Sequence, residues 1–310
     1  HYCSRRQRQM CIRDSVQTPS CKKRMIHLRV LSRTTMSKMK SGDFEVSRNK
    51  DKLREIEVTL DFTPNALASV LYRQGETVIL ACVTKAEGLP RWFPRDSQRG
   101  WIHAEYSLLP GSTDSRFRRE RNGAKGRTQE IERLVARSLR GAIDLEQLGP
   151  IALTVDCDVL NADGGTRCAS ITAACIAIRL AVRRLINNGE CLPIKLRPSR
   201  EDLKNGWKKP DLTQEEKYNH ENMVIKNNVA AVSVGLIDED IYLDLDYILD
   251  SNADVDMNVV MTSDGEFVEV QGTGEESTYT REQLDSLLDM AEKGNSLLHE
   301  MQINTLSEAN

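Results

Sequence analysis

The sequence predicts an α+β fold made of two related halves of βαβ type. Short segments in which apolar and polar residues alternate indicate strands, and longer segments with apolar residues at helical spacing indicate helices. These patterns follow one another as strands, helix, strand, helix, strands, helix. With 310 residues, 39% of them hydrophobic, the chain is long enough to form a packed core.

The first half is predicted to begin with strands over 56–62, 68–73 and 77–84. A helix opens at Gly126, and its apolar positions recur at Ile131, Leu134, Val135, Leu139, Ala142 and Ile143. Arg133, Arg137 and Arg140 fall on another face of the same helix. Residues 151–159 then alternate as a strand, and 161–165 break it before a second helix that begins near Thr166.

The second half is predicted to contain strands over 229–237, 241–248, 257–261 and 267–271. Thr280 and Gln283 form a capping box ahead of an amphipathic helix. We expect a single domain over 47–300, followed by a tail over 301–310.

Two segments lack periodicity. Residues 1–46 are basic and rich in Ser, Arg and Lys, which predicts a disordered extension. Residues 8–15 resemble translated adaptor sequence, so we expect a natural start near Met36 or Met39; a genuine basic arm that touches RNA is the alternative. Residues 195–222, with Pro198, Gly206 and Pro210, predict a surface insertion.

The turn Gly164-Gly165-Thr166-Arg167 can bind an anion, because it precedes a helix whose first N–H groups have no intrahelical partner. A helix terminus contributes roughly 0.3–1 kcal/mol, whereas millimolar binding requires about 4 kcal/mol. Charge-assisted hydrogen bonds of about 1.5–3 kcal/mol each, from Arg167, Thr166 and a second arginine such as Arg127, supply the difference. The alternative is a plain tight turn with a solvated arginine.

Several motifs together resemble the ribonuclease PH family, in order, over residues 47–300. They are GWIHAEY at 100–106, GRTQEI at 126–131, DCDV at 156–159, NADGGTR at 161–167, DVDMNVVMT at 254–262 and VQGT at 270–273. The resemblance implies a ribosomal-protein-S5-domain-2-like fold. It also implies a phosphate-dependent 3′-to-5′ exoribonuclease, or tRNA nucleotidyltransferase, that trims transfer RNA precursors and assembles as a hexameric ring, a trimer of dimers.

The same resemblance assigns roles to residues. Arg127, Gly165, Thr166 and Arg167 are expected to bind inorganic phosphate, the co-substrate. Two further pairs follow: Asp250 and Asp256 are expected to hold Mg²⁺, and Arg116 and Arg119 to contact transfer RNA. Mg²⁺ is commonly held by one or two carboxylates with water and substrate phosphates, although acidic residues in such a run also form solvated rims.

The chain departs from the family pattern at Gly111, where an arginine usually follows the Leu-Pro pair, and in a slightly short loop over 121–126. Both changes fall in the region on which the expected affinity for transfer RNA depends. Cys168 and Ala173 are milder departures in the helix after the phosphate turn.

RNA binding requires a local basic patch, because the formal net charge is -3. We expect Trp92 and Trp101 to lie in the core, with stacking on bases as the alternative. The basic residues gather in one stretch, which includes Lys85, Arg91, Arg95, Arg99, Arg116, Arg118, Arg119, Arg121, Lys125, Arg127, Arg133, Arg137 and Arg140.

Other classes of protein are disfavoured. No apolar run approaches the roughly 18 residues of a membrane span, and the cysteines lack zinc-site spacing, which indicates reduced thiols in the cytoplasm. His103 and His220 are isolated, which disfavours a catalytic histidine, and the glycine run before Arg127 lacks P-loop order, which disfavours a nucleotide kinase.

The alternatives left open are a catalytically silent RNA-binding subunit of an exosome-like ring and, less favoured, a polynucleotide phosphorylase.

Overall fold

The computed structural model describes residues 48–94, 97–274 and 277–308, and these belong to one compact unit assigned to Ser47–Asn310. The expectations for residues 1–46 lie outside the described residues. In the described part of the chain, no helix is long and apolar enough to cross a membrane.

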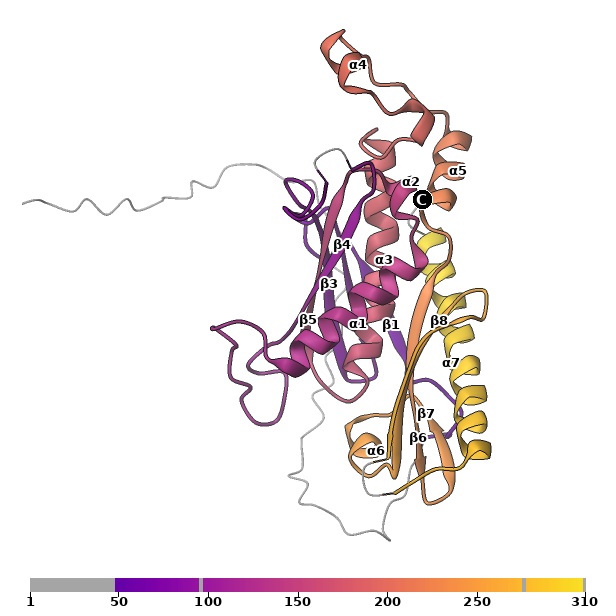
Figure 1. The fold of residues 1–310 in the computed structure, drawn as a ribbon. Coiled ribbons are helices and arrows are strands. Elements are labelled where there is room, and N and C mark those ends of the chain that lie inside the picture. Colours follow the sequence, from indigo (N-terminus) through magenta and orange to yellow (C-terminus); the bar gives the residue numbers. More distant parts are fainter. Residues whose placement is uncertain (1–47, 95–96, 275–276, 309–310) are drawn as a thin grey trace, which may run out of the picture. The chain divides into compact units, whose positions relative to one another are not determined.

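The first half of the chain forms a five-stranded sheet with the order β1-β2-β3-β5-β4 (Figure 1). Its strands pair antiparallel except β4 and β5, which run parallel. The bounds are β1 Ile56–Leu60, β2 Ala68–Gln74, β3 Thr77–Lys85, β4 Trp101–Leu108 and β5 Ala152–Asn161. Helix α1 (Gly126–Ala142) and the short α2 (Leu145–Leu148) connect β4 to β5, which is the βαβ crossover that a parallel pair requires.

The second half forms a four-stranded antiparallel sheet with the order β7-β6-β8-β9. Its elements are β6 Val229–Ile237, β7 Asp240–Leu243, α6 Tyr247–Ser251, β8 Val255–Thr262, β9 Phe267–Gly274 and α7 Arg281–Ser307. The βαβ description therefore applies to the first half, because the strands of the second half pair antiparallel.

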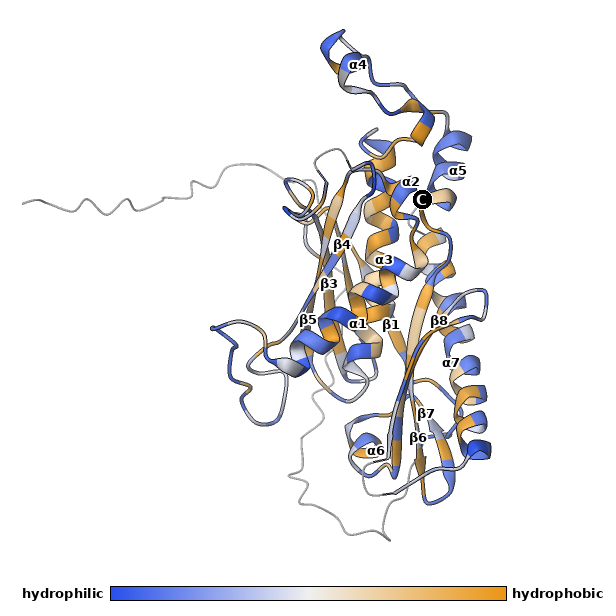
Figure 2. Cartoon of the chain, viewed as in Figure 1, coloured by the Kyte–Doolittle hydropathy of each residue, from blue (hydrophilic) through white to orange (hydrophobic). Residues whose placement is uncertain are grey.

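Helix α3 (Thr166–Asn187) joins the two halves, because it contacts β2 and β3 on one side and β6 on the other. Sixteen of its 22 residues are buried. Strand β6 is buried along eight of its nine residues, since α3 covers one face of its sheet and α7 the other. Figure 2 shows the same distribution, with hydrophobic residues along α3 and the central strands and hydrophilic ones on the outer face of α1.

The predicted insertion divides into two parts. A short 3₁₀ turn (Ile194–Leu196) and α4 (Arg200–Lys204) extend outward, as expected of a surface excursion. Helix α5 (Gln214–Val224) instead packs on α3, because the buried carboxylate of Glu221 forms ion pairs with Arg179 and Arg183 of α3 at 3.0 and 2.9 Å.

Three other predictions need correction, and one strand was missed. The strand expected over 241–248 ends at Leu243, because Asp244 adopts φ 59° and Asp246 caps α6. Strand β4 was not predicted, and α7 runs to Ser307 through most of the expected tail. Trp92 is 68% exposed rather than part of the core.

Candidate active site

The phosphate-binding turn is held by backbone geometry that only glycine adopts easily. Gly164 and Gly165 have φ values of 72° and 62°, the left-handed region. A Cβ on Gly164 would lie 2.4 Å from the carbonyl oxygen of Leu245, so the turn of the first half packs against the β7–α6 connection of the second. Thr166 then begins α3, with its N-terminus at the junction of the two halves.

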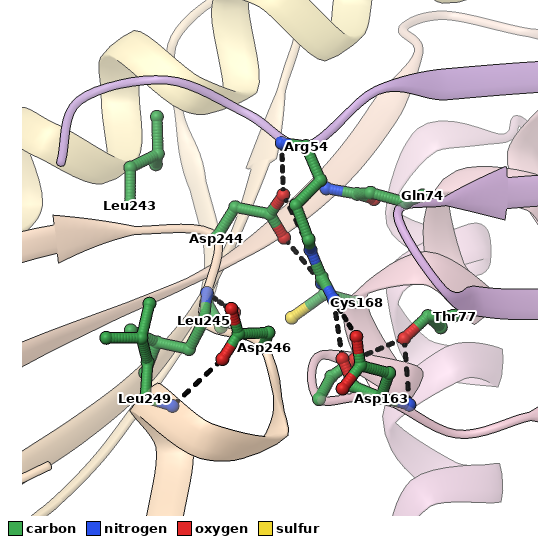
Figure 3. Close-up of polar contacts among 12 residues, drawn as sticks. Arg54, Gln74, Thr77, Asp163, Cys168, Leu243, Asp244, Leu245, Asp246 and Leu249 are labelled. Carbon is green, nitrogen blue, oxygen red and sulfur yellow. Dashed lines mark hydrogen bonds and ion pairs between the residues drawn. The ribbon is translucent and has the colours of Figure 1, made fainter. Parts of the chain in front are cut away.

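A buried ion pair fastens this junction (Figure 3). The Arg54 guanidinium donates to both oxygens of Asp244, at 3.1 and 2.7 Å, and to the carbonyl of Asp163. The two side chains are 8% and 2% exposed. On the other side of the turn, the hydroxyl of Thr77 donates to the carbonyl of Gly164 at 2.7 Å.

The pKa values of the two aspartates at the junction, Asp244 and Asp163, are shifted in opposite directions. Burial disfavours the charge of Asp244, but the attraction and hydrogen bonds of Arg54 outweigh it and lower the pKa of that carboxyl. For Asp163, burial outweighs the attraction of Arg54 and raises the pKa. Asp244 is therefore the stable counterion of Arg54.

Of the predicted phosphate residues, Gly165, Thr166 and Arg167 lie at the start of α3, and Arg127 lies in the first turn of α1. Thr166 Oγ1 lies 2.9 Å from the hydroxyl of Tyr106 on β4. Burial raises the pKa of Tyr106, and the positive charges of Arg127 and Arg167 both oppose that rise. Both guanidinium groups therefore act on the same point beside Thr166, Arg127 from the first turn of α1 and Arg167 from the first turn of α3.

Arg167 is held from two sides. Its guanidinium donates to Oε1 of Gln271 on β9 and lies 3.6 Å from a carboxylate oxygen of Glu130 on α1. Arg127, by contrast, is exposed and forms no ion pair within the described residues. Of the two arginines expected to bind phosphate, Arg167 is therefore held in place and Arg127 is free to adjust.

The predicted metal residues come from α6 and β8. Asp256 and Asn258 share one face of β8, and the thiol of Cys168 in the first turn of α3 donates to Oδ1 of Asn258 at 3.1 Å. Burial raises the pKa of Cys168 to about 12, and the charge of Asp250 adds to the rise. Both aspartates thus lie near the start of α3, although no group of three or more metal-ligating side chains occurs among the described residues.

Arg116 and Arg119 lie apart from this turn, in the loop between β4 and α1. The loop surrounds a hollow of about 810 Å³. Five cations and one carboxylate are among its lining residues, which are Arg116, Arg118, Arg119, Glu120, Arg121, Asn122, Gly123, Ala124 and Lys125. The loop is strongly basic, as an RNA-binding surface requires.

The sequence reasoning missed Arg54, Asp244, Gln271 and Tyr106. A signal existed for Tyr106 and Gln271, which lie within the GWIHAEY and VQGT motifs. Cys157, Cys168 and Cys175 are free and buried, as predicted. His103 is exposed, and His220 is buried beside Cys191 with its Nε2 3.5 Å from the thiol.

The two sheets joined by α3, with an arginine-bearing turn between them, correspond to the two domains of the 3′ exoribonuclease family. Sequence profiles of the 3′ exoribonuclease family match here, domain 1 over residues 52–183 and domain 2 over residues 227–294. The chain belongs to the ribonuclease PH family. Ribonuclease PH of Corynebacterium efficiens is 47% identical over 249 residues, 80% of this chain and 89% of that protein. Ribonuclease PH of Rhodopirellula baltica is 44% identical over 257 residues, 83% and 94% of the two chains.

Solved structures share the fold. Rice (Oryza sativa) Rrp46 has a TM-score of 0.61 at 16% identity and covers 84% of this chain and 98% of its own. The Archaeoglobus fulgidus exosome with RNA bound to the active site has a TM-score of 0.60 at 21% identity, with coverages of 82% and 90%. These matches confirm the predicted α+β ribonuclease PH fold.

Proposed function

We propose that this protein is a phosphorolytic 3′-to-5′ exoribonuclease that trims the 3′ ends of transfer RNA precursors. The proposal rests on the position of Thr166 and Arg167 at the N-terminus of α3, beside the Tyr106 hydroxyl on which the charge of Arg127 also acts. The ribonuclease PH relatives, at 44–47% identity over most of the chain, support it.

The reaction joins two anions. An oxygen of inorganic phosphate attacks the phosphorus of the last phosphodiester, the bond to the preceding O3′ breaks, and that oxygen takes up a proton. The products are a nucleoside diphosphate and an RNA shortened by one nucleotide; the reverse reaction adds a nucleotide. Arg127 and Arg167 offset the repulsion between attacking and scissile phosphates, and the N–H groups that open α3 orient the attacking one.

Asp250 on α6 and Asp256 on β8 would hold a Mg²⁺ ion, because carboxylate oxygens are its preferred protein ligands and one or two of them suffice when water and substrate phosphates complete the shell. When bound, the ion supplies charge stabilisation at the scissile phosphoryl group. The side chains of the chain itself position the attacking phosphate and hold the two halves together.

Asp256→Asn tests the metal assignment. We expect it to remove magnesium-dependent turnover while RNA affinity stays within about twofold, because only a ligand to the ion is lost. Asp264→Asn, an exposed carboxylate in the turn after β8, is the matched control. Full turnover by Asp256→Asn at limiting magnesium rejects the assignment.

The central test follows the products formed from a short RNA with a 3′ tail, with and without inorganic phosphate. Nucleoside diphosphates are expected only with phosphate. Arg127→Ala should lower phosphorolysis by about a hundredfold or more, as for loss of a preorganised anion donor. Arg281→Ala, an exposed arginine on α7 outside the basic stretch, should behave as wild type.

Other products would change the conclusion. Monophosphates formed without phosphate identify a hydrolase. Binding without cleavage identifies the silent RNA-binding ring subunit, the second function considered.

We also propose a cytoplasmic homo-oligomer, a hexameric ring. A ring places several arginine loops on one RNA, and electrostatic affinity grows with the number of phosphates contacted. The free cysteines of the described residues suit a reducing compartment. A monomer in sedimentation velocity at micromolar concentration argues against the ring.

A further inference from the structure

A second basic groove lies at the C-terminal end of α1, away from the phosphate turn. Its volume is about 710 Å³. Four cations and two carboxylates are among its lining residues, which are Arg99, Trp101, Arg137, Arg140, Gly141, Ile143, Asp144, Leu145, Glu146 and Lys226. We call it the Trp101 groove.

The cations of the Trp101 groove are incompletely neutralised. Arg137 pairs with Glu269 at 2.9 Å and Lys226 with Asp144 at 3.1 Å. The Arg140 guanidinium stacks over the Trp101 ring at 4.3 Å, and its charge has no carboxylate partner within the described residues. Burial lowers the pKa of Arg140, and the nearby charges of Arg137 and then Arg99 lower it further. Like charges held together in this way favour a polyanion as ligand.

An exposed aromatic cluster adjoins these cations. Trp92 packs edge-on against Trp101 with ring centroids 5.0 Å apart, and its other neighbour is Phe93 at 4.6 Å. Trp92 nevertheless remains 68% exposed. An exposed indole on a rigid aromatic base, next to an arginine, is a stacking surface for an unpaired base.

We infer that the Trp101 groove binds single-stranded RNA upstream of the 3′ end, with the cations on the phosphates and Trp92 stacked on a base. The inference rests on the proposed function. Arg127 and Arg140 are thirteen residues apart on α1, an axial rise of about 20 Å. This rise corresponds to about six stacked nucleotides. The groove should therefore contact longer single strands and not RNAs of about four nucleotides.

Trp92→Ala and Arg99→Gln, both at exposed positions, test the groove, and the control is Arg281→Gln, an exposed arginine on α7 outside the basic stretch. Binding is measured by fluorescence anisotropy with RNAs of about 4 and about 16 nucleotides. The first is shorter and the second longer than the roughly six nucleotides between the phosphate turn and the groove. Both variants should bind the long RNA about fivefold or more weakly and the short RNA as wild type does. Phosphorolysis of the short RNA should be unchanged.

The outcomes separate the two proposals. Phosphorolysis of the short RNA by wild type, with long-RNA affinity unchanged in both groove variants, overturns the groove and leaves the proposed function intact. No phosphorolysis of the short RNA by wild type overturns the proposed function itself. A changed sedimentation coefficient with unchanged RNA affinity makes the groove a contact between copies of this chain, which also overturns the inference.

Discussion

Gly164 shows how one residue links stability to phosphate binding. Its φ of 72° suits glycine, and an added Cβ would overlap the backbone of Leu245 and Asp246. Unlike a flexible side chain, that backbone is fixed by Ser233, whose hydroxyl accepts from the N–H of Leu245 at 3.0 Å. The turn therefore transmits any change at Gly164 to Thr166 and Arg167.

We predict that Gly164→Ala lowers the free energy of unfolding by more than 2 kcal/mol, because left-handed strain of roughly 1–2 kcal/mol is joined by a backbone clash. It should also raise the KM for phosphate. Gly265→Ala is the control, since its φ is 84° and its Cβ would meet open space. Urea unfolding of both variants measures the difference, and equal losses would show that only φ matters.

The pairing of Arg54 with Asp244 was invisible in the sequence, because 190 residues separate the two. Neither residue lies in an alternating or helical pattern that marks it as buried. The phosphate residues were visible because Gly164, Gly165, Thr166 and Arg167 are contiguous and carry their own chemistry. Residue type and local order were therefore enough to predict the phosphate turn. They were not enough to predict the Arg54–Asp244 ion pair that holds it.

Among the elements, β5 and α1 were predictable because each has one apolar and one more polar face, and α3, which is buried on nearly all sides, was predictable from apolar residues at helical spacing. Strand β4 alternates over Trp101–Leu108 but begins with Trp101 and carries His103 and Glu105 on its open face, and it was not singled out. The prediction that Trp92 lies in the core was wrong, because its indole packs on the outer side of Trp101. Whether Trp92 is buried depends on this packing, which the sequence does not specify.

Helix α7 offers a test of local capping. Thr280 and Gln283 form the predicted capping box, with Thr280 Oγ1 accepting from the N–H of Gln283 at 3.2 Å. Thr280→Ala should lower the free energy of unfolding by about 1 kcal/mol. The same change at Ser199, which caps the exposed five-residue α4, should have little effect on global unfolding because α4 can open locally. Thermal and urea unfolding compare the two, and an equal loss at Ser199 would contradict this explanation.

At the scale of the whole molecule, the buried pair makes stability depend on pH. The folded pKa of Asp244 lies below its ordinary value of 3.8, so its stabilisation is present above that pH and is lost as pH falls through the folded pKa. Asp163, whose pKa is raised, acts in the opposite sense, since protonating it as pH falls relieves its buried charge. Of these two aspartates, Asp244 is therefore the one whose protonation lowers stability in acid.

We predict that Asp244→Asn lowers the free energy of unfolding at neutral pH by roughly 3–5 kcal/mol, because it leaves Arg54 buried with only the partly exposed carboxylate of Asp163, 3.6 Å away, as counterion. It should also flatten the fall in stability below pH about 4. Urea unfolding across the acidic range measures both effects, with exposed Asp264→Asn as control. Parallel pH curves for wild type and Asp244→Asn would exclude this carboxyl as the acid-sensitive group.

The sequence by itself determined the α+β class, most of the strands and long helices, and the chemistry of the phosphate turn. It did so because side-chain period and contiguous motifs are local properties of the chain. Only the tertiary structure decided that Arg54 and Asp244 lock this turn to the second half, and that Arg140 and the tryptophans form a groove. Such contacts depend on which distant segments meet, and the burial of α3 between two sheets determines that meeting.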